Sequence, residues 1–247
     1  HKPEPIENLE LKHDFNFLAV SQISPRKNFD NMVKWFVEEF IDQPVGLVIK
    51  TNMASNSILD FEHLQKVMKQ LLENYKERKC SVYLLHGDLT PGQMTGLYTH
   101  DKIKGMINIA HGEGFGLPMF EAAREGLPIT TIGWSGQLDF LHHDGKDYYN
   151  KVDYSIQPIQ PQAVWPGILE KDAMWANAEQ GSYKMALRRA YKKADKMKSQ
   201  AIELKKLIED KFSDEVLYER FVNCVYGDEV DLDDWMAELE SEMVESD

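Results

Sequence analysis

The sequence of 247 residues contains very little cysteine and no long apolar run. Its two cysteines, Cys80 and Cys224, are too few for a disulfide framework and lack the spacing of a metal-binding motif. No stretch approaches the roughly 20 apolar residues that a membrane-spanning helix needs, and no signal peptide is visible. These absences exclude a disulfide scaffold and a membrane span, and we expect a globular protein of the reducing cytoplasm.

Basic residues are missing from the end of the chain. Residues 228–247 hold ten acidic residues and no Lys or Arg, and they carry most of the formal net charge of −13. The other residues have 31 acids against 28 bases, so the body is nearly neutral and offers no general surface for nucleic acid. We interpret residues 228–247 as an acidic tail that docks on a basic helix or on a partner, because its apolar residues have helical spacing.

The glycine pattern of a dinucleotide-binding loop is also absent. That loop reads Gly-x-Gly-x-x-Gly directly after the first strand, with an acid about twenty residues later. Here the first expected strand, residues 14–20, is followed by the residues SQISP. A dinucleotide-dependent dehydrogenase is therefore disfavoured.

Apolar runs of strand length alternate with segments of helical periodicity along the first half of the chain. This alternation predicts an α/β fold with a Rossmann-like parallel sheet that carries helices on both faces, followed by C-terminal helices. The expected strands are residues 14–20, 45–50, 82–85, 103–110 and 128–132, and the expected helices are residues 28–41, 57–75, 91–98, 117–125 and 183–212. We interpret residues 1–13 as a linker, 14–227 as the domain and 148–167 as an irregular connection.

The most informative segment is the run HGEGFGLPMFEA at residues 111–122. It follows an apolar strand, and Pro118 suits the first turn of a helix, where its missing N–H costs nothing. A glycine-rich turn that leads into a helix N-terminus favours anions, because free N–H groups and the helix dipole both attract them. Glu113 lies in the turn, and Glu121 lies about one turn inside the helix.

These residues resemble the E-x7-E signature of the group-1 retaining glycosyltransferases, which have the GT-B fold. The next residues, AAREGLPIT at 122–130 and the small turn at 135–136, are similar to the family pattern as well. Upstream, residues 17–20 and 24–28 resemble the first strand and the phosphate-binding loop of the same domain. The resemblance runs from about residue 15 to residue 141 and covers one half of such an enzyme, the C-terminal donor-binding domain.

The resemblance implies roles for individual residues. Glu113, the catalytic candidate, would contact hydroxyls of the donor sugar, although retaining members have no agreed protein nucleophile. Glu121 would accept hydrogen bonds from the nucleotide's ribose, and Lys27 would contact phosphate. The remaining donor-binding candidates supply backbone amides to the sugar and the β-phosphate; they are Gly114, Phe115, Gly116 and Leu117. No cofactor and no metal are expected, since GT-B enzymes are generally metal-independent.

The chain departs from the family pattern at Gln22, where the family usually has an arginine that clamps the diphosphate. Glutamine can donate a hydrogen bond but carries no charge, and charge-assisted hydrogen bonds are the stronger ones. Arg26 or Lys50 could substitute, and Arg26 has the shorter path because it lies in the same loop. For His111, next to the signature, a sugar contact and a packing role both stay open. The pair at residues 142–143 fits a loop better than a metal site, because no third ligand is evident nearby.

The resemblance therefore implies a retaining glycosyltransferase that moves a sugar from a nucleotide-diphosphate sugar to an unknown acceptor. The chain begins at His1, and the acceptor-binding half is missing from it. We expect this chain alone to have little or no transferase activity. The alternative is a non-catalytic module on the same fold that binds a nucleotide, a glycan or a partner, which Gln22 and the missing half favour.

Overall fold

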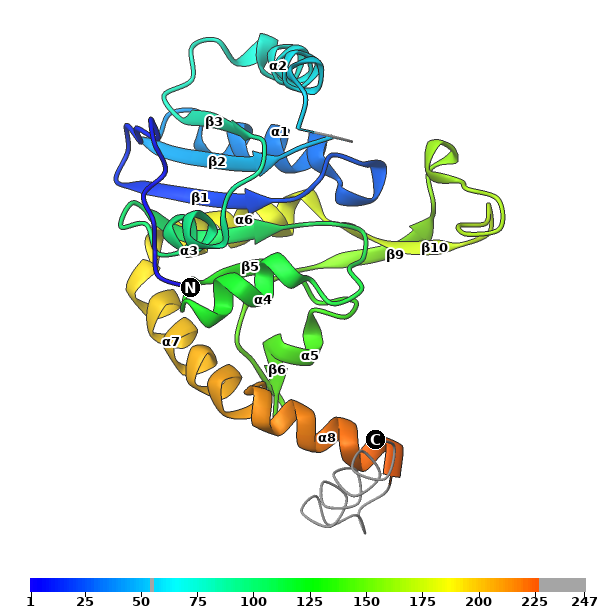
Figure 1. Cartoon of the computed structure of the whole chain (residues 1–247). Coiled ribbons are helices and arrows are strands. Elements are labelled where there is room, and N and C mark those ends of the chain that lie inside the picture. The colour runs from blue at the N-terminus through cyan, green and yellow to red at the C-terminus, as the bar shows by residue number, and fades with distance from the viewer. Residues whose placement is uncertain (54–55, 227–247) are drawn as a thin grey trace, which may run out of the picture. The chain divides into compact units, whose positions relative to one another are not determined.

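The computed structural model describes residues 1–53 and 56–226 (Figure 1). The chain divides into two compact units, residues 1–205 and 206–247, and each is described by itself. The predicted acidic tail, residues 228–247, lies outside the described residues. None of the helices within the described residues is both long enough and apolar enough to cross a membrane.

The first unit is built on a six-stranded sheet in which every neighbouring pair of strands is parallel. The strand order is β3-β2-β1-β4-β5-β8, so the predicted Rossmann-like α/β fold is confirmed. The strands are β1 (Phe15–Val20), β2 (Val45–Thr51), β3 (Ser81–His86), β4 (Ile103–Asn108), β5 (Ile129–Ile132) and β8 (Asn150–Val152). Each bound of the first five strands lies within two residues of the sequence prediction.

Helices cover both faces of this sheet (Figure 1). One face carries α1 (Phe29–Phe40), α2 (Ile58–Leu72) and α6 (Gln180–Lys192), whose buried residues share a core with the strands. The other face carries α3 (Pro91–Tyr98) and α4 (Leu117–Arg124), which pack on each other. The helix α1 belongs to the core because its apolar residues recur every three to four positions, which places them on one stripe.

The segment after β5 differs from its prediction as an irregular connection. After α5 (Leu138–Leu141) come the short strands β6 (His142–His143) and β7 (Lys146–Asp147), and then β8. The strands β9 (Tyr154–Pro158) and β10 (Met174–Ala178) form an antiparallel hairpin, and Figure 1 shows it projecting beyond the strand ends of the sheet. The interpretation of residues 148–167 as irregular is therefore wrong for β8 and β9, because strands outside this segment pair with them: β5 with β8, and β10 with β9.

The predicted long helix over residues 183–212 is two helices. The first, α6, ends at Lys192. The backbone angles of the next residue, Lys193 (φ −123°, ψ 38°), leave the helical region, and α7 (Ala194–Lys211) begins directly after it. The single-helix prediction was wrong because the helical spacing of the sequence continues across this break. The second unit contains α8 (Asp214–Tyr226), and no residue of α8 is buried.

The predicted linker at residues 1–13 is part of the first unit, where it contacts α3. The amide of Glu4 donates to the carbonyl of Gly92 over 2.9 Å, and the Glu4 carboxylate accepts from the hydroxyl of Thr90 over 2.8 Å. A Cβ at Gly96 would lie 1.9 Å from the carbonyl oxygen of Glu4, so glycine at this position permits the close approach. Leu11, further along the same segment, is buried. The segment around Glu4 thus lies along α3.

Candidate functional site

The strand order places the candidate site. β1 and β4 are neighbours in the sheet, and the chain leaves β1 toward β2 but leaves β4 toward β5, on the opposite side. Parallel sheets bind ligands beyond the carboxyl ends of their strands, at the point where this order reverses. The loop after β1 carries Arg26 and Lys27, and the loop after β4 carries Glu113. The fold therefore brings together residues that lie 86 positions apart in the sequence.

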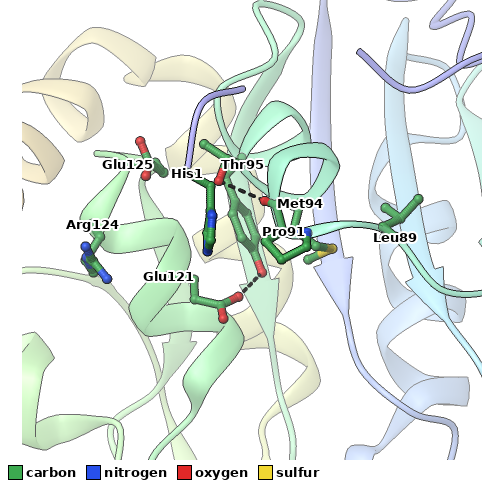
Figure 2. Close-up of a pocket in the computed structure, with 9 residues that line it drawn as sticks. His1, Leu89, Pro91, Met94, Thr95, Glu121, Arg124 and Glu125 are labelled. Carbon is green, nitrogen blue, oxygen red and sulfur yellow. Dashed lines mark hydrogen bonds between the residues drawn. The ribbon is translucent and has the colours of Figure 1, made fainter. Parts of the chain in front are cut away.

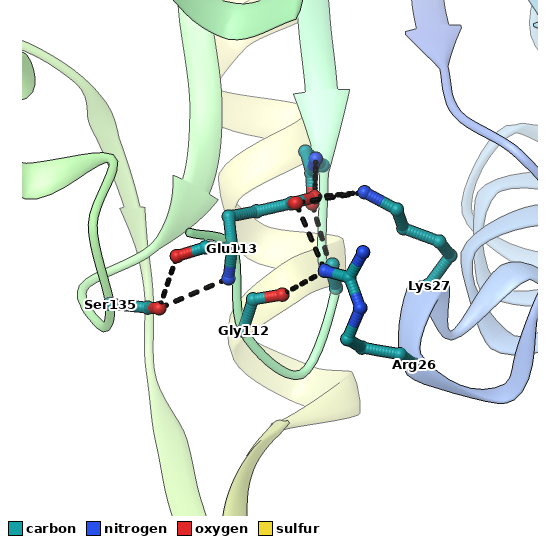
Figure 3. A network of polar contacts seen from close by, with 7 residues as sticks. Arg26, Lys27, Gly112, Glu113 and Ser135 are labelled. Carbon is teal, nitrogen blue, oxygen red and sulfur yellow. Dashed lines mark hydrogen bonds and ion pairs between the residues drawn. The ribbon is translucent and has the colours of Figure 1, made fainter. Parts of the chain in front are cut away.

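Two cations converge on the carboxylate of Glu113 (Figure 3). Nζ of Lys27 donates to both of its oxygens, over 2.6 Å to Oε1 and 2.8 Å to Oε2. Nη1 of Arg26 donates to Oε2 over 3.1 Å and to the carbonyl of Gly112 over 2.5 Å. Asn108, at the end of β4, donates to Oε1 over 3.0 Å. Two positive side chains and one negative side chain leave a net positive charge at this point, which favours an anion.

The electrostatics of Glu113 follow from these partners. The side chain is buried, with a relative exposure of 8%. Burial alone would raise the pKa of Glu113, but hydrogen bonds from Lys27, Asn108 and Arg26 stabilise the carboxylate and hold its pKa below the ordinary value. Lys27 is 14% exposed and Arg26 is 47% exposed at the side chain, so Arg26 is the partner with more access to solvent.

The backbone of Glu113 is held by the turn after β5. Oγ of Ser135 accepts from the amide of Glu113 over 3.0 Å and donates to its carbonyl over 2.6 Å (Figure 3). The amide of Gly136 donates to the same carbonyl over 3.1 Å. A Cβ at Gly136 would lie 1.8 Å from the carbonyl oxygen of Gly114, so this turn can reach the loop only with glycine there.

The remaining residues of the signature form the start of α4. Gly116 is the N-cap residue and has a left-handed backbone (φ 85°), where a side chain is strained. The ring of Phe115 packs against Phe120 and Phe140, with 5.1 Å between ring centroids in each case. Gly114 and Leu117 are exposed. The ring of Phe115 is thus occupied by packing. The groups of this turn that can bind an anion are the free backbone amides at the start of α4.

Glu121 lies in a separate pocket beside α3 (Figure 2). Its Oε2 accepts a hydrogen bond of 2.8 Å from the hydroxyl of Tyr98, the last residue of α3. The pocket has a volume of about 370 Å³ and is lined by His1, Leu89, Pro91, Met94, Thr95, Tyr98, Glu121, Arg124 and Glu125. The two glutamates of the signature therefore have different surroundings, one in an ion cluster and one at an open pocket.

The structure separates the three residues that could complete a phosphate clamp. Arg26 lies in the ion cluster. Gln22 is exposed, and its side-chain amide donates to the carbonyl of Met53 over 2.6 Å instead. Lys50, at the end of β2, is half-buried; burial lowers its pKa, and Asp88 opposes that effect. Of the two proposed substitutes for the family arginine, Arg26 is therefore the one that contacts Glu113 within the described residues.

His111 is buried and held by the hairpin. Its imidazole stacks on Trp175, with ring centroids 4.3 Å apart and 13° between the planes, and its Nδ1 lies 2.7 Å from the carbonyl oxygen of Ala176. Its amide donates to the carbonyl of Arg26 over 2.8 Å. Burial lowers the pKa of His111, and the Ala176 carbonyl opposes that effect. The packing role that the sequence left open is therefore present, and Nε2 is buried without a partner among the described residues.

Four residues of the site did not come from the sequence prediction: Asn108, Ser135, Tyr98 and Trp175. Asn108 ends a predicted strand and Ser135 lies in the small turn of the resemblance, so both had a local signal. Tyr98 and Trp175 reach the site through tertiary packing, which no local sequence pattern indicates. At the remaining histidine pair, Nδ1 of His142 lies 2.6 Å from a carboxylate oxygen of Asp147. Within residues 1–53 and 56–226, no group of three or more His, Cys, Asp and Glu residues could hold a metal ion.

Comparisons with known proteins agree on one architecture. A structure described as trehalose-6-phosphate from E. coli, bound with UDP-2-fluoro glucose, matches with a TM-score of 0.61 and 12% identity over 89% of this chain and 45% of its own. The C-terminal domain of a group-1 glycosyl transferase family protein (LpcC) from Francisella tularensis matches with a TM-score of 0.56 and 13% identity over 85% of this chain and 95% of its own. Sucrose-phosphate synthase from Thermosynechococcus elongatus matches with a TM-score of 0.59 and 13% identity over 99% of this chain and 50% of its own.

The chain has the fold of the C-terminal half of a GT-B glycosyltransferase. It spans about half the length of the two longer neighbours and nearly all of the isolated C-terminal domain. No family model matches the sequence, and no curated protein matches it either. At 12–13% identity the likeness concerns the fold, and the function is argued from the site.

Proposed function

We propose that this chain is the donor-binding part of a retaining glycosyltransferase that uses a nucleotide-diphosphate sugar. The observation that carries the proposal is the convergence of Arg26 and Lys27 on Glu113, at the carboxyl ends of β1 and β4 and beside the start of α4. This arrangement suits a ligand with both negative charge and hydroxyl groups. The bound UDP-2-fluoro glucose of the E. coli neighbour is such a ligand, and it supports the choice.

The chemistry follows from the charges. When a glycosyl bond breaks, negative charge grows on the departing diphosphate, and preorganised donors lower the barrier. Lys27, Arg26 and the amides of residues 114–117 are the donors that we assign to this role. Arg26 then takes the place of the family arginine that is Gln22 here. Glu113 accepts hydrogen bonds from hydroxyls of the donor sugar, and we assign no protein nucleophile.

The nucleoside is assigned to the pocket beside Glu121. The carboxylate accepts hydrogen bonds from the ribose, and the apolar side chains of Leu89, Pro91 and Met94 offer a surface for the base. The proposal needs neither cofactor nor metal. The acceptor binds in large part to the other half of the enzyme, so we propose that this chain alone does not transfer sugar. The unpaired cysteines of the structure support a cytoplasmic location.

The test is isothermal calorimetry of the chain with UDP, GDP and ADP. We expect one of the three to bind, and we expect Glu121→Ala to weaken it about tenfold, since hydrogen bonds to charged groups contribute about 1.5–3 kcal/mol. The matched control is Glu62→Ala, which removes an exposed carboxylate of α2 and leaves affinity unchanged. Unchanged affinity in Glu121→Ala would refute the ribose assignment, and a chain that binds none of the three would refute the donor-binding role.

The alternative, a binding module without catalysis, is favoured by one observation. Gln22 is uncharged, and its side-chain amide donates to the carbonyl of Met53. The position that carries an arginine in the family therefore supplies no positive charge here. Glycosyl transfer or donor hydrolysis by a protein that contains both halves would eliminate this alternative.

A further inference from the structure

Glu121 has a neutral partner in the core. Tyr98 is 4% exposed, and its hydroxyl donates to Oε2 of Glu121 over 2.8 Å. Within the described residues, Oε1 of the same carboxylate accepts no hydrogen bond, and Glu121 lines the pocket beside α3 (Figure 2). One carboxylate oxygen is therefore fixed by the protein, and the other is left for a ligand.

We propose that Tyr98 is a positioning residue, which holds the Glu121 carboxylate in the orientation that recognises the ribose hydroxyls of the donor. This inference rests on the proposed function, because it concerns the same nucleotide. A side chain with three rotatable bonds loses conformational freedom when it binds a ligand, and a preformed hydrogen bond removes part of that cost in advance. Tyr98 thus selects ribose over deoxyribose although it makes no contact of its own with the sugar.

A tyrosine suits this role better than a cation would. An ammonium or guanidinium group would neutralise the carboxylate, whereas a hydroxyl orients it through one oxygen and leaves its charge. Burial raises the pKa of Tyr98 well above its usual value, and the neighbouring carboxylate raises it further. The hydroxyl therefore keeps its proton and remains a donor throughout the working range of pH.

The test compares ligands on one preparation of protein. The probes are the diphosphate that binds best among UDP, GDP and ADP, and its 2′-deoxy and 3′-deoxy analogues, measured by calorimetry. For the wild type we expect at least one deoxy analogue to bind about tenfold more weakly, because one hydrogen bond to a charged group is lost. In Tyr98→Phe we expect this ratio to fall below about threefold, because the carboxylate is no longer held.

The matched control is Tyr75→Phe, because Tyr75 donates to a carboxylate oxygen of Glu38 over 2.9 Å and does not line the pocket. It should leave the ratio at its wild-type value. The ratio compares two ligands on the same sample, so a partial loss of folded protein in Tyr98→Phe does not change it. Glu121→Ala provides a second variant, whose ratio should fall to about one.

The outcomes separate the two proposals. A wild-type ratio retained in Tyr98→Phe, whatever the absolute affinity, overturns the positioning role. A wild-type ratio retained in Glu121→Ala overturns the positioning role as well, because the Glu121 carboxylate would then not be the group that recognises the ribose hydroxyls. A wild-type chain that binds none of the three diphosphates contradicts the proposed function itself.

Discussion

Two glutamates eight positions apart occupy different chemical environments in this chain. Glu113 is buried, and two cations and an amide donate to its carboxylate. Glu121 is half-buried at an open pocket, and a neutral hydroxyl is its hydrogen-bond donor. The difference arises because Glu113 precedes α4 and meets the loop after β1, whereas Glu121 lies inside α4 and meets α3. One sequence signature thus builds two regions: a Glu113 region of ion pairs, and a Glu121 region with a neutral hydrogen-bond donor at an open pocket.

The comparison also shows what holds each region. The Glu113 loop depends on the hydrogen bonds of Ser135 and on a close approach by Gly136. Glu121 is positioned by a regular helix and by one tyrosine. A change of backbone shape should therefore affect the Glu113 region more than the Glu121 region.

The largest expected effect is that of Gly136→Ala. The added Cβ would lie 1.8 Å from the carbonyl oxygen of Gly114, a backbone atom that can move only if the loop shifts. We expect a loss of about 3 kcal/mol in the free energy of unfolding, measured by urea denaturation. The control is Gly181→Ala in α6, where the Cβ would have no neighbour within 4 Å and should stabilise by up to about 1 kcal/mol. Equal stability of wild type and Gly136→Ala would contradict the structural role of this turn.

The next prediction tests whether recognition of the phosphate charge is separate from recognition of the nucleoside. In Lys27→Met we expect the affinity for the bound nucleoside diphosphate to fall about 10- to 100-fold, since a charge-assisted contact to phosphate is lost. The affinity for the corresponding nucleoside, which has no phosphate, should stay unchanged in competition calorimetry. The control is Lys34→Met, which removes an exposed lysine of α1. An equal loss for diphosphate and nucleoside would show that Lys27 acts on the whole site and does not read phosphate.

The smallest effect concerns acid stability. The folded state lowers the pKa of Glu113 below its ordinary value of 4.5, so the ionised group stabilises the fold above that pH. This contribution is lost as the pH falls through the lower, folded-state pKa. We expect Glu113→Gln to lose less stability than the wild type between pH 5 and about pH 3, measured by thermal denaturation. Lys27→Met should show a weaker acid dependence too, and parallel curves for all three proteins would refute the role of the ion cluster in stability.

The sequence predicted the sheet well because its first five strands are apolar runs separated by helices of clear periodicity. The order of these elements limits the possible connections, so the strand ends that carry Arg26, Lys27 and Glu113 were placed together in advance. The later segments were less predictable. β8 has three residues and β9 has a polar pattern, and such strands are defined by their partners more than by their own composition.

The sequence predicted which residues belong to the site, but it did not predict the contacts between their side chains. The assignment of Lys27 to phosphate and of Glu113 to sugar stays a prediction, and the direct ion pair between them was not expected. The ion pair depends on side-chain geometry across two loops, which no sequence spacing encodes. The same holds for the stacking of His111 on Trp175, since the two residues meet only after the hairpin has formed.

The way in which His111 is held has a consequence for how the chain folds. The loop after β4 takes contacts from Arg26, which is about 85 positions earlier, and from Ala176, which is 65 positions later. Closing loops of such length costs entropy that early, local structure does not repay. The parallel pairing of β1 with β4 closes a loop of similar length, so we expect the sheet and these loops to form late, after the local helices. During refolding, stacking of Trp175 should then appear as a slower fluorescence phase than the gain of helix.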